Sequence, residues 1–257
     1  MSQLFSRIEG TGQPLVVLHG WGMNHRVWEP VRQPLAEHAQ VSWIDLPGHG
    51  DSHQAEATSI DGIAELLLPH IPQGAVIMGW SLGGLVAQAL AVKYPERVAA
   101  LILVASTPCF VQHDNWAYGL PQAVLQGFSE NLQQDYQATV KRFFALQFMG
   151  VKSDPKAVSQ LRNDIMSKPA TMQALTGGLA ILNTADFSQQ VIEQPKQWIF
   201  GRLDKLIPAS LADALEPNES QQVHVMQKAA HVPFVTHPDE FLAVVIPFIE
   251  QVQHGQA

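Results

Sequence analysis

The sequence predicts an α/β protein with a mostly parallel sheet flanked by helices. Three observations support this class: short apolar runs end in turn residues, helical patterns separate them, and 46% of the 257 residues are hydrophobic against 15% charged. Buried parallel strands have continuous apolar runs, and their connections are right-handed crossovers, usually helices. The expected strands span residues 15–18, 41–44, 75–78, 101–104, 197–200 and 223–226.

Helical patterns fill the intervals between these runs and follow the last one, at 59–70, 82–94 and 241–252. Strand-like runs stop near Pro108 and resume near Pro195. Four helical patterns occupy the interval, at 120–132, 135–149, 155–166 and 171–184. A structureless connection of this length would be uncommon. We therefore expect an all-helical cap, residues 109–188, between the sixth and seventh strands of a core formed by 1–108 and 189–257.

Composition and charge exclude several classes of function. The formal net charge is −8, which argues against nucleic-acid binding, since that needs a basic face. There is no apolar run long enough to span a membrane and no apolar signal core at the start. The single cysteine, Cys109, cannot form an internal disulfide. We expect a monomer in the cytoplasm.

A candidate nucleophile lies in Gly79-Trp80-Ser81-Leu82-Gly83-Gly84, between the run at 75–78 and the helical pattern that follows. This is G-x-S-x-G in a strand–turn–helix context. A sharp turn lifts the serine hydroxyl above the sheet edge, and the following helix points its N-terminal amides at any anion formed there. The alternative is a glycine-rich turn that contains an incidental serine.

The serine needs a general base, and four histidines follow the cap. His231 follows the last strand run, at the carboxyl end where parallel sheets bind ligands. His224 falls within that run, His237 precedes Pro238 at a helix start, and His254 lies in a polar tail. We therefore favour His231.

An acid that orients the base is expected between the serine and the histidine in chain order. Asp204 follows the strand run at 197–200, again at a carboxyl end. It would hold the histidine tautomer and stabilise the imidazolium. Its alternative role is a cap for the next helix, and the rivals Asp213 and Glu216 have the pattern of a solvated surface.

Two backbone amides would stabilise the oxyanion: that of Leu82, directly after the nucleophile, and that of Trp21, in the loop after the first long strand. His19, at the end of that strand, is expected to bond nearby loop amides. The glycine-rich loop at 45–52 lacks nucleotide-binding patterns and is interpreted as a structural turn. No spacing of His, Cys and Asp suggests a metal site, and we expect no cofactor.

Together these residues resemble the α/β-hydrolase fold over nearly the whole chain. The resemblance rests on residues 19–22, 45–50 and 79–84 and on the loops of Asp204 and His231. Related dehalogenases and epoxide hydrolases use an aspartate as nucleophile, so the serine at position 81 excludes both.

A closer resemblance, to the biotin-pathway carboxylesterases, rests on residues 80–87, 105–110, 142–147 and 228–231. It implies hydrolysis of the methyl ester of a pimeloyl chain carried on acyl carrier protein, with release of methanol. It also implies that Trp21, Ser81, Leu82 and His231 surround the ester. The implied acyl tunnel is lined by Phe143, Phe144, Ala145, Leu146 and Gln147, whose alternative role is ordinary cap core.

Basic residues cluster in the cap although the chain is acidic. Between Lys141 and Lys168 there are six basic residues and two acidic ones, a net charge of +4. This stretch could be a solvated helix face or a docking patch for an acidic carrier protein, and Ala138 stands where relatives tend to have arginine. The candidate docking residues are Lys141, Arg142, Lys152, Lys156 and Arg162.

The preferred function is a serine carboxylesterase that acts on the carrier-linked ester and also accepts small esters. One alternative is a hydrolase of the same fold that acts on a small free ester, an enol-lactone or a carbon–carbon bond. Another is a binding protein or receptor of this fold without significant turnover.

Overall fold

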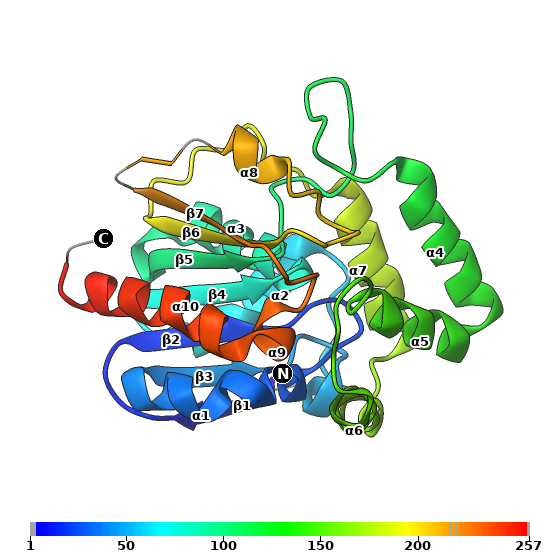
Figure 1. Ribbon diagram of the computed structural model, residues 1–257, viewed down its shortest axis with the longest axis horizontal. Coiled ribbons are helices and arrows are strands. Elements are labelled where there is room, and N and C mark those ends of the chain that lie inside the picture. Colours follow the sequence, from blue (N-terminus) through cyan, green and yellow to red (C-terminus); the bar gives the residue numbers. More distant parts are fainter. Residues whose placement is uncertain (1–3, 216, 219, 256–257) are drawn as a thin grey trace.

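A computed structural model describes residues 4–215, 217–218 and 220–255. Seven strands form one sheet in the order β1-β3-β2-β4-β5-β6-β7, in which β1 alone is antiparallel to its neighbour (Figure 1). The strands are β1 (Ser6–Glu9), β2 (Pro14–Leu18), β3 (Gln40–Ile44), β4 (Ala75–Trp80), β5 (Val98–Val104), β6 (Lys196–Gly201) and β7 (Gln221–Met226).

Helices cover both faces of the sheet. Figure 1 shows α1 and α10 in front of the strands and α2 and α3 behind them. The flanking helices are α1 (Glu29–His38), α2 (Ile60–Leu67), α3 (Leu82–Lys93), α8 (Leu211–Ala214), α9 (Pro233–Thr236) and α10 (Pro238–Gln253). Short 3-10 turns are η1 (His25–Trp28), η2 (Gly50–Ser52), η3 (Leu68–His70) and η4 (Pro95–Arg97). No helix within the described ranges is long and apolar enough to cross a membrane.

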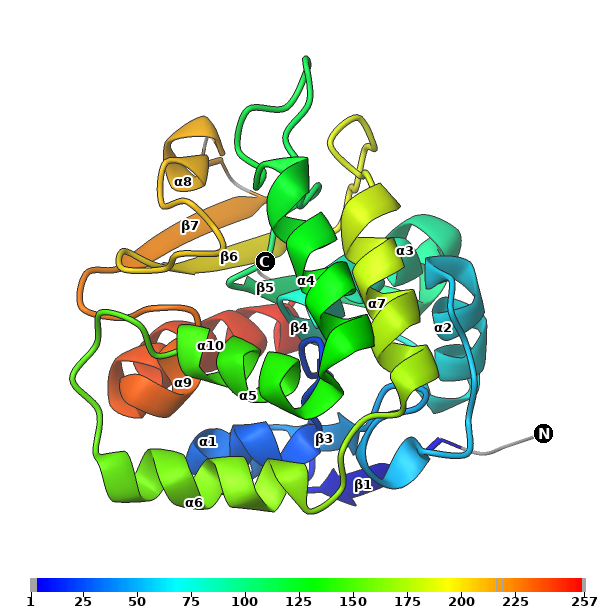
Figure 2. The same ribbon diagram turned by 90° about the vertical axis from the view of Figure 1, so that its right-hand side faces the viewer.

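Four further helices form a layer beyond the carboxyl ends of the strands (Figure 2). They are α4 (Gln122–Gln134), α5 (Tyr136–Leu146), α6 (Pro155–Met166) and α7 (Met172–Thr184), and they agree with the four expected helical patterns. They lie between β5 and β6, so the expected position between the sixth and seventh strands is wrong. The described chain before β2 forms one strand only, β1, and five strands therefore precede these helices.

The centre of the core is the contact of α3 with β4 and β5. Every residue of β4 is buried, and so is α3 from Leu82 to Ala91. Small residues allow this close approach: a Cβ atom on Gly83 would lie 2.5 Å from the carbonyl oxygen of Leu18 in β2. This packing fixes the N-terminus of α3 against the carboxyl edge of the sheet.

Two buried histidines join the loops that follow β2 and β3. His19 accepts a hydrogen bond from the Leu46 amide at 3.0 Å, and His49 accepts one from the Gly22 amide at 3.3 Å. The expected role of His19 as a partner of loop amides is confirmed. Burial lowers the pKa of both imidazoles, that of His19 to about 3, so both are neutral in the fold.

Acidification should destabilise the protein through these histidines. Each ring is neutral when folded but protonates in the unfolded chain below about pH 6.5, so the free energy of unfolding falls as the pH falls. For His19 the loss between pH 7 and pH 5 should be about 2 kcal/mol. Urea unfolding at both pH values measures it. His49→Gln keeps an acceptor for the Gly22 amide but cannot titrate, so its free energy of unfolding should fall less between pH 7 and pH 5 than that of the wild type. An equal fall in this variant would contradict titration of His49.

Two helical glycines should respond in opposite directions to alanine. Gly83→Ala should lower the free energy of unfolding by about 1–3 kcal/mol, because the new methyl group overlaps the end of β2. Gly127→Ala in α4, where a Cβ would meet nothing within 4 Å, should raise it by up to about 1 kcal/mol. Denaturant unfolding of both variants provides the comparison. Equal stability of the two variants would contradict the close approach at Gly83.

Candidate active site

Ser81 occupies a strained turn between β4 and α3. Its φ and ψ are 54° and −116°, a conformation that costs a non-glycine residue about 1–3 kcal/mol. The end of β5 holds the turn in place: the Ser81 amide donates to Val104 O at 3.0 Å, and Ser106 Oγ donates to Ser81 O at 2.8 Å. The strain is therefore maintained by hydrogen bonds to the last residue of β5 and to Ser106, two positions after it.

Glycine is required on both sides of this turn. A Cβ atom on Gly79 would lie 2.2 Å from the carbonyl oxygen of Gly83, so the chain could not close with any larger residue. The spacing of the motif, with glycines two residues before and after the serine, follows from this contact. The turn places Ser81 at the carboxyl edge of the sheet, where it is only 3% exposed.

His231 and Asp204 are joined by a short hydrogen bond. His231 Nδ1 donates to Asp204 Oδ2 at 2.7 Å, and each side chain is 1% exposed. The other carboxylate oxygen, Oδ1, accepts from the amides of Leu206 at 2.8 Å and Ile207 at 3.1 Å. Because the carboxylate fixes the proton on Nδ1, the lone pair of His231 lies on Nε2.

Nε2 of His231 is buried and has no hydrogen-bond partner within the described part of the chain. Trp80, the residue before Ser81, holds the base near the turn: its indole N–H donates to His231 O at 2.8 Å, and the two rings lie 5.6 Å apart. The free acceptor nitrogen thus lies in the neighbourhood of the serine, with no hydrogen bond between them in this structure.

The loop after β2 lies against the serine. A Cβ atom on Gly20 would be 3.3 Å from Ser81 Cβ, and Trp21 follows directly. Neither the Trp21 amide nor the Leu82 amide donates to an acceptor among the residues that the structure describes. Two N–H groups are therefore without an acceptor in the described chain, one in the loop that approaches the serine and one on the first residue of α3.

Helix α7 covers this edge of the sheet. A Cβ atom on Gly178 would lie 2.6 Å from Trp21 Cδ1 and 3.4 Å from Leu82 Cδ2, so α7 rests on both residues. The Trp21 indole also donates to Leu175 O at 2.8 Å. On the α5 side, the Phe143 ring meets the Trp21 ring edge-on at 4.8 Å. The serine is enclosed by the cap helices.

Polar contacts hold the α6–α7 connection to the core. Asn24 Nδ2 donates to the carbonyl oxygens of Ile165 at 3.0 Å and Lys168 at 3.2 Å. Lys168 Nζ also pairs with Asp51 at 3.2 Å. These contacts anchor one end of the cap beside the loops that His19 and His49 join.

The five residues implied to line an acyl tunnel do not share one environment. Phe143, Phe144 and Gln147 are buried, Leu146 is half-buried and Ala145 is exposed. Successive side chains of an α-helix point about 100° apart, so five consecutive residues cannot face one cavity. The expectation is therefore corrected for Ala145, whose side chain points to solvent. Gln147 donates to Phe143 O at 3.0 Å, while its buried Oε1 has no partner among the described residues.

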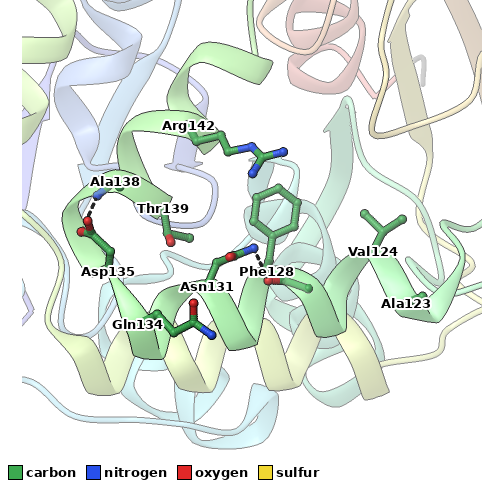
Figure 3. A pocket seen from close by; sticks show the side chains of 10 residues that line it. Ala123, Val124, Phe128, Asn131, Gln134, Asp135, Ala138, Thr139 and Arg142 are labelled. Carbon is green, nitrogen blue, oxygen red and sulfur yellow. Dashed lines mark hydrogen bonds between the residues drawn. The ribbon is translucent and has the colours of Figure 1, made fainter.

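A pocket of about 360 Å³ opens between α4 and α5 on the outer side of the cap (Figure 3). Phe128 forms part of its wall and meets the Phe143 ring edge-on at 5.6 Å. Since Phe143 in turn meets Trp21, two aromatic rings separate this pocket from the loop beside Ser81. Figure 3 shows Arg142 of α5 near Phe128 of α4.

All five candidate docking residues are exposed. Lys141 and Arg142 lie on α5, Lys152 precedes α6, and Lys156 and Arg162 lie on α6. Within the described ranges none of them forms an ion pair with a carboxylate. Their positive charges are therefore available to solvent and to a partner.

The rival residues lie elsewhere. His224 is half-buried on β7, where burial lowers its pKa, and His237 precedes α10 with Nδ1 2.9 Å from the neighbouring Thr236 hydroxyl. His254 and Asp213 are exposed, and Glu216 lies outside the described residues. Only His231 among these histidines contacts Asp204 in the described chain.

Three residues that support the site were not identified from the sequence: Trp80, Ser106 and Gly178. Trp80 lies within the serine motif but at a position that the motif leaves open. Gly178 belongs to a Gly177-Gly178 pair inside a helical pattern. Because glycine weakens a helix, such a pair signals a close contact, and that signal could have been used.

Comparisons with known proteins give a consistent assignment. Residues 13–238 match the family described as alpha/beta hydrolase fold. A pimeloyl-[acyl-carrier protein] methyl ester esterase from Pectobacterium carotovorum is 41% identical over 97% of this chain and 100% of its own length. The esterase of the same name from Serratia marcescens is 43% identical over 97% of this chain and 99% of its own.

Solved structures agree on the fold. An esterase from Exiguobacterium antarcticum superposes with a TM-score of 0.86 at 21% identity, over 96% of this chain and 95% of its own. A bromoperoxidase from Bacillus anthracis gives the same TM-score at 20% identity and the same coverage. The chain therefore belongs to the alpha/beta hydrolase fold family and, within it, to the family of the pimeloyl-[acyl-carrier protein] methyl ester esterases.

Proposed function

We propose that this protein hydrolyses the methyl ester of pimeloyl-acyl carrier protein methyl ester, with Ser81 as nucleophile, His231 as general base and Asp204 as its partner. The relatives' names supply the substrate. The single observation that carries the chemistry is the His231 side chain, anchored to Asp204 through Nδ1 at 2.7 Å while its buried Nε2 is free to accept a proton.

The reaction begins with attack of Ser81 Oγ on the ester carbonyl carbon as His231 Nε2 takes the hydroxyl proton. Negative charge then develops on the carbonyl oxygen. The Trp21 and Leu82 amides, which have no acceptor among the described residues, are the proposed donors to this oxyanion. Each such donor is worth about 3–4 kcal/mol of transition-state stabilisation.

Collapse of the tetrahedral intermediate breaks the bond to the methoxy oxygen. His231 returns its proton to that oxygen and methanol leaves, while the acyl group remains on Ser81. His231 then takes a proton from water, which attacks the acyl carbon. In the second collapse the bond to Ser81 Oγ breaks, His231 returns the proton to that oxygen, and the ω-carboxylate is released. Asp204 stays ionised throughout and stabilises the imidazolium at each step.

The cap is proposed to receive both parts of the substrate. Phe143, which meets Trp21, and the neighbouring Phe144 and Gln147 are the proposed acyl-contact residues. The exposed basic residues of α5 and α6 are proposed to bind acyl carrier protein, because acidic partners are steered and oriented by unpaired positive charge. They are Lys141, Arg142, Lys152, Lys156 and Arg162.

We propose the cytoplasm as the site of the reaction. The described chain contains one cysteine, Cys109, as a free thiol, which suits a reducing compartment. The proposed division, a cap at 109–188 on a core of 1–108 and 189–257, assigns the three catalytic residues to the core and carrier recognition to the cap.

Asp204→Asn should lower kcat about 10⁴-fold without unfolding the protein. The Asn Oδ1 atom can still accept the hydrogen bonds from the Leu206 and Ile207 amides. Its NH₂ group then faces His231 Nδ1, so the ring proton moves to Nε2, and this tautomer cannot act as the base. Hydrolysis of a p-nitrophenyl ester measures the effect, with Ser81→Ala as the baseline. Asp213→Asn, an exposed aspartate on α8, is the matched control. Asp204→Asn activity within tenfold of wild type would refute the assignment.

Charge reversal on the cap should separate the carrier-linked substrate from small esters. Lys141→Glu, Arg142→Glu and Lys156→Glu together should lower kcat/KM for the carrier-linked ester about tenfold or more at low salt, because steering is lost. Turnover of a p-nitrophenyl ester should not change. Arg7→Glu, on β1 in the core, controls for the effect of reversing one charge outside the cap and is compared with each of the three substitutions made singly. Equal losses on both substrates would contradict docking at this patch.

A further inference from the structure

Three side chains of metal-binding type, none of them a proposed catalytic residue, meet at the base of the cap. The Cys109 sulfur, a ring nitrogen of His113 and a carboxylate oxygen of Asp186 all lie within 4.8 Å of one another. Cys109 and His113 follow β5, and Asp186 follows α7. The group therefore joins the segment that leads into the cap helices to the segment that leads out of them.

The backbone holds these residues together without an ion. Cys109 and Asp186 are antiparallel bridge partners. His113 pairs with Trp116 through two backbone hydrogen bonds of 2.9 and 2.8 Å, and the Trp116 indole donates to Cys109 O at 2.8 Å. These contacts fold the loop so that the imidazole reaches Asp186, with Nε2 3.1 Å from Oδ2. The arrangement is thus largely formed in advance.

We propose that Cys109, His113 and Asp186 bind a divalent transition-metal ion of the Zn²⁺ type. One sulfur, one imidazole nitrogen and one carboxylate oxygen are a donor set that Zn²⁺ accepts in tetrahedral geometry, with water at the fourth position. Bonds of about 2.0–2.3 Å require the most distant donor atoms to approach by about 1 Å.

The proton balance of binding is simple. The Cys109 thiol releases its proton to solvent as the sulfur–metal bond forms. The proton that His113 Nε2 shares with Asp186 moves to Nδ1, so the ring stays neutral. The Asn115 amide, 3.4 Å from Nδ1, must then turn away, which is a small change in an exposed loop.

Exposure and charge at the site suit a cation from solvent. Cys109 is 5% exposed, whereas the His113 and Asp186 side chains are 39% and 38% exposed. An ion can therefore reach the two outer ligands first, and the thiolate that forms is sheltered. Asp186 accepts hydrogen bonds from the Ser188 amide at 2.8 Å and from His113 at 3.1 Å, both donors that a carboxylate oxygen binds.

A second group of similar composition, His25, Asp45 and Asp51, is less suited to a metal. Asp45 Oδ1 already accepts the amide and ring N–H groups of His25, at 2.7 and 2.9 Å. Asp51 pairs with Arg26 at 2.8 Å and with Lys168 at 3.2 Å. Two cations already neutralise that group. At Cys109 the described chain supplies no lysine or arginine in an ion pair with Asp186.

Cobalt titration of the full-length protein tests the proposal, because Co²⁺ occupies Zn²⁺-type sites and reports its ligands in its spectrum. We expect one Co²⁺ per chain, with a thiolate charge-transfer band in the near ultraviolet, and displacement of Co²⁺ by Zn²⁺. Cys109→Ser should abolish the band. His113→Gln and Asp186→Asn should each weaken binding by about tenfold or more. His53→Gln, an exposed histidine outside the group, should bind as wild type does.

A second measurement does not depend on spectroscopy. Zn²⁺ should raise the Tm of the wild type, since an ion that binds only the folded state stabilises it. Cys109→Ser keeps the His113–Asp186 contact and should show no such rise. Equal Co²⁺ affinity in the wild type and Cys109→Ser, or no binding up to millimolar Co²⁺, would overturn the proposal. The three residues would then have only a structural role, in the contacts that join the two segments at the base of the cap. Hydrolysis is not part of either readout, so failure here is distinct from failure of the proposed esterase function.

Discussion

The turn at Ser81 is the constraint on which the rest of the site depends. Its positive φ is unfavourable for serine, and the glycines at 79 and 83 approach too closely to accept a side chain. Two hydrogen bonds, one to the last residue of β5 and one from Ser106 just after it, hold this conformation. Because the turn is fixed, the first amide of α3 and the serine hydroxyl have a defined relation. The other groups of the site are arranged around that fixed point.

The base is positioned by a chain of contacts that begins in the same turn. Trp80 precedes the serine, and its indole binds the backbone of His231, while Asp204 binds the ring. Asp204 is in turn held by two amides of its own loop. Each member is buried, so the hydrogen bonds form in a region of low dielectric constant, where they are stronger than in water. This arrangement leaves Nε2 of His231 as a buried acceptor nitrogen without a partner in the described chain.

The strand positions and the catalytic candidates could be predicted from sequence because their signals are local. Continuous apolar runs mark β4 and β5, and the motif around Ser81 reports a turn that only glycine permits. β1 was not predicted, because Ser6–Glu9 is a short, polar edge strand. α1 was also missed, since prolines at positions 30 and 34 argue against a helix although both are accommodated.

Other features depend on residues that are distant in sequence and could not be read from a local pattern. Gly178 meets Trp21 only because α7 folds back over the sheet edge. Asp186 reaches Cys109 only through the pairing of the two segments at the base of the cap. The expectation of no metal site rested on the spacing of His, Cys and Asp along the sequence, and this spacing does not show that Cys109 and Asp186 are neighbours in the fold. The exposure of Ala145 could likewise be found only once the direction in which its side chain leaves α5 was known.

The net charge of −8 describes the chain as a whole and hides a division between its parts. The core holds the buried site, in which the Asp204 carboxylate accepts hydrogen bonds from His231 and from two backbone amides of its own loop. The cap instead exposes the five candidate docking residues, which pair with no carboxylate of the described chain, whereas Lys168 pairs with Asp51. Screening limits such surface charges to about 10 Å in ordinary salt, so they act on an arriving partner rather than on the enclosed serine. In the proposed function, recognition of the carrier is assigned to the cap surface and the reaction to the residues around the turn at Ser81, so substitutions on the cap surface can change recognition without changing the reaction.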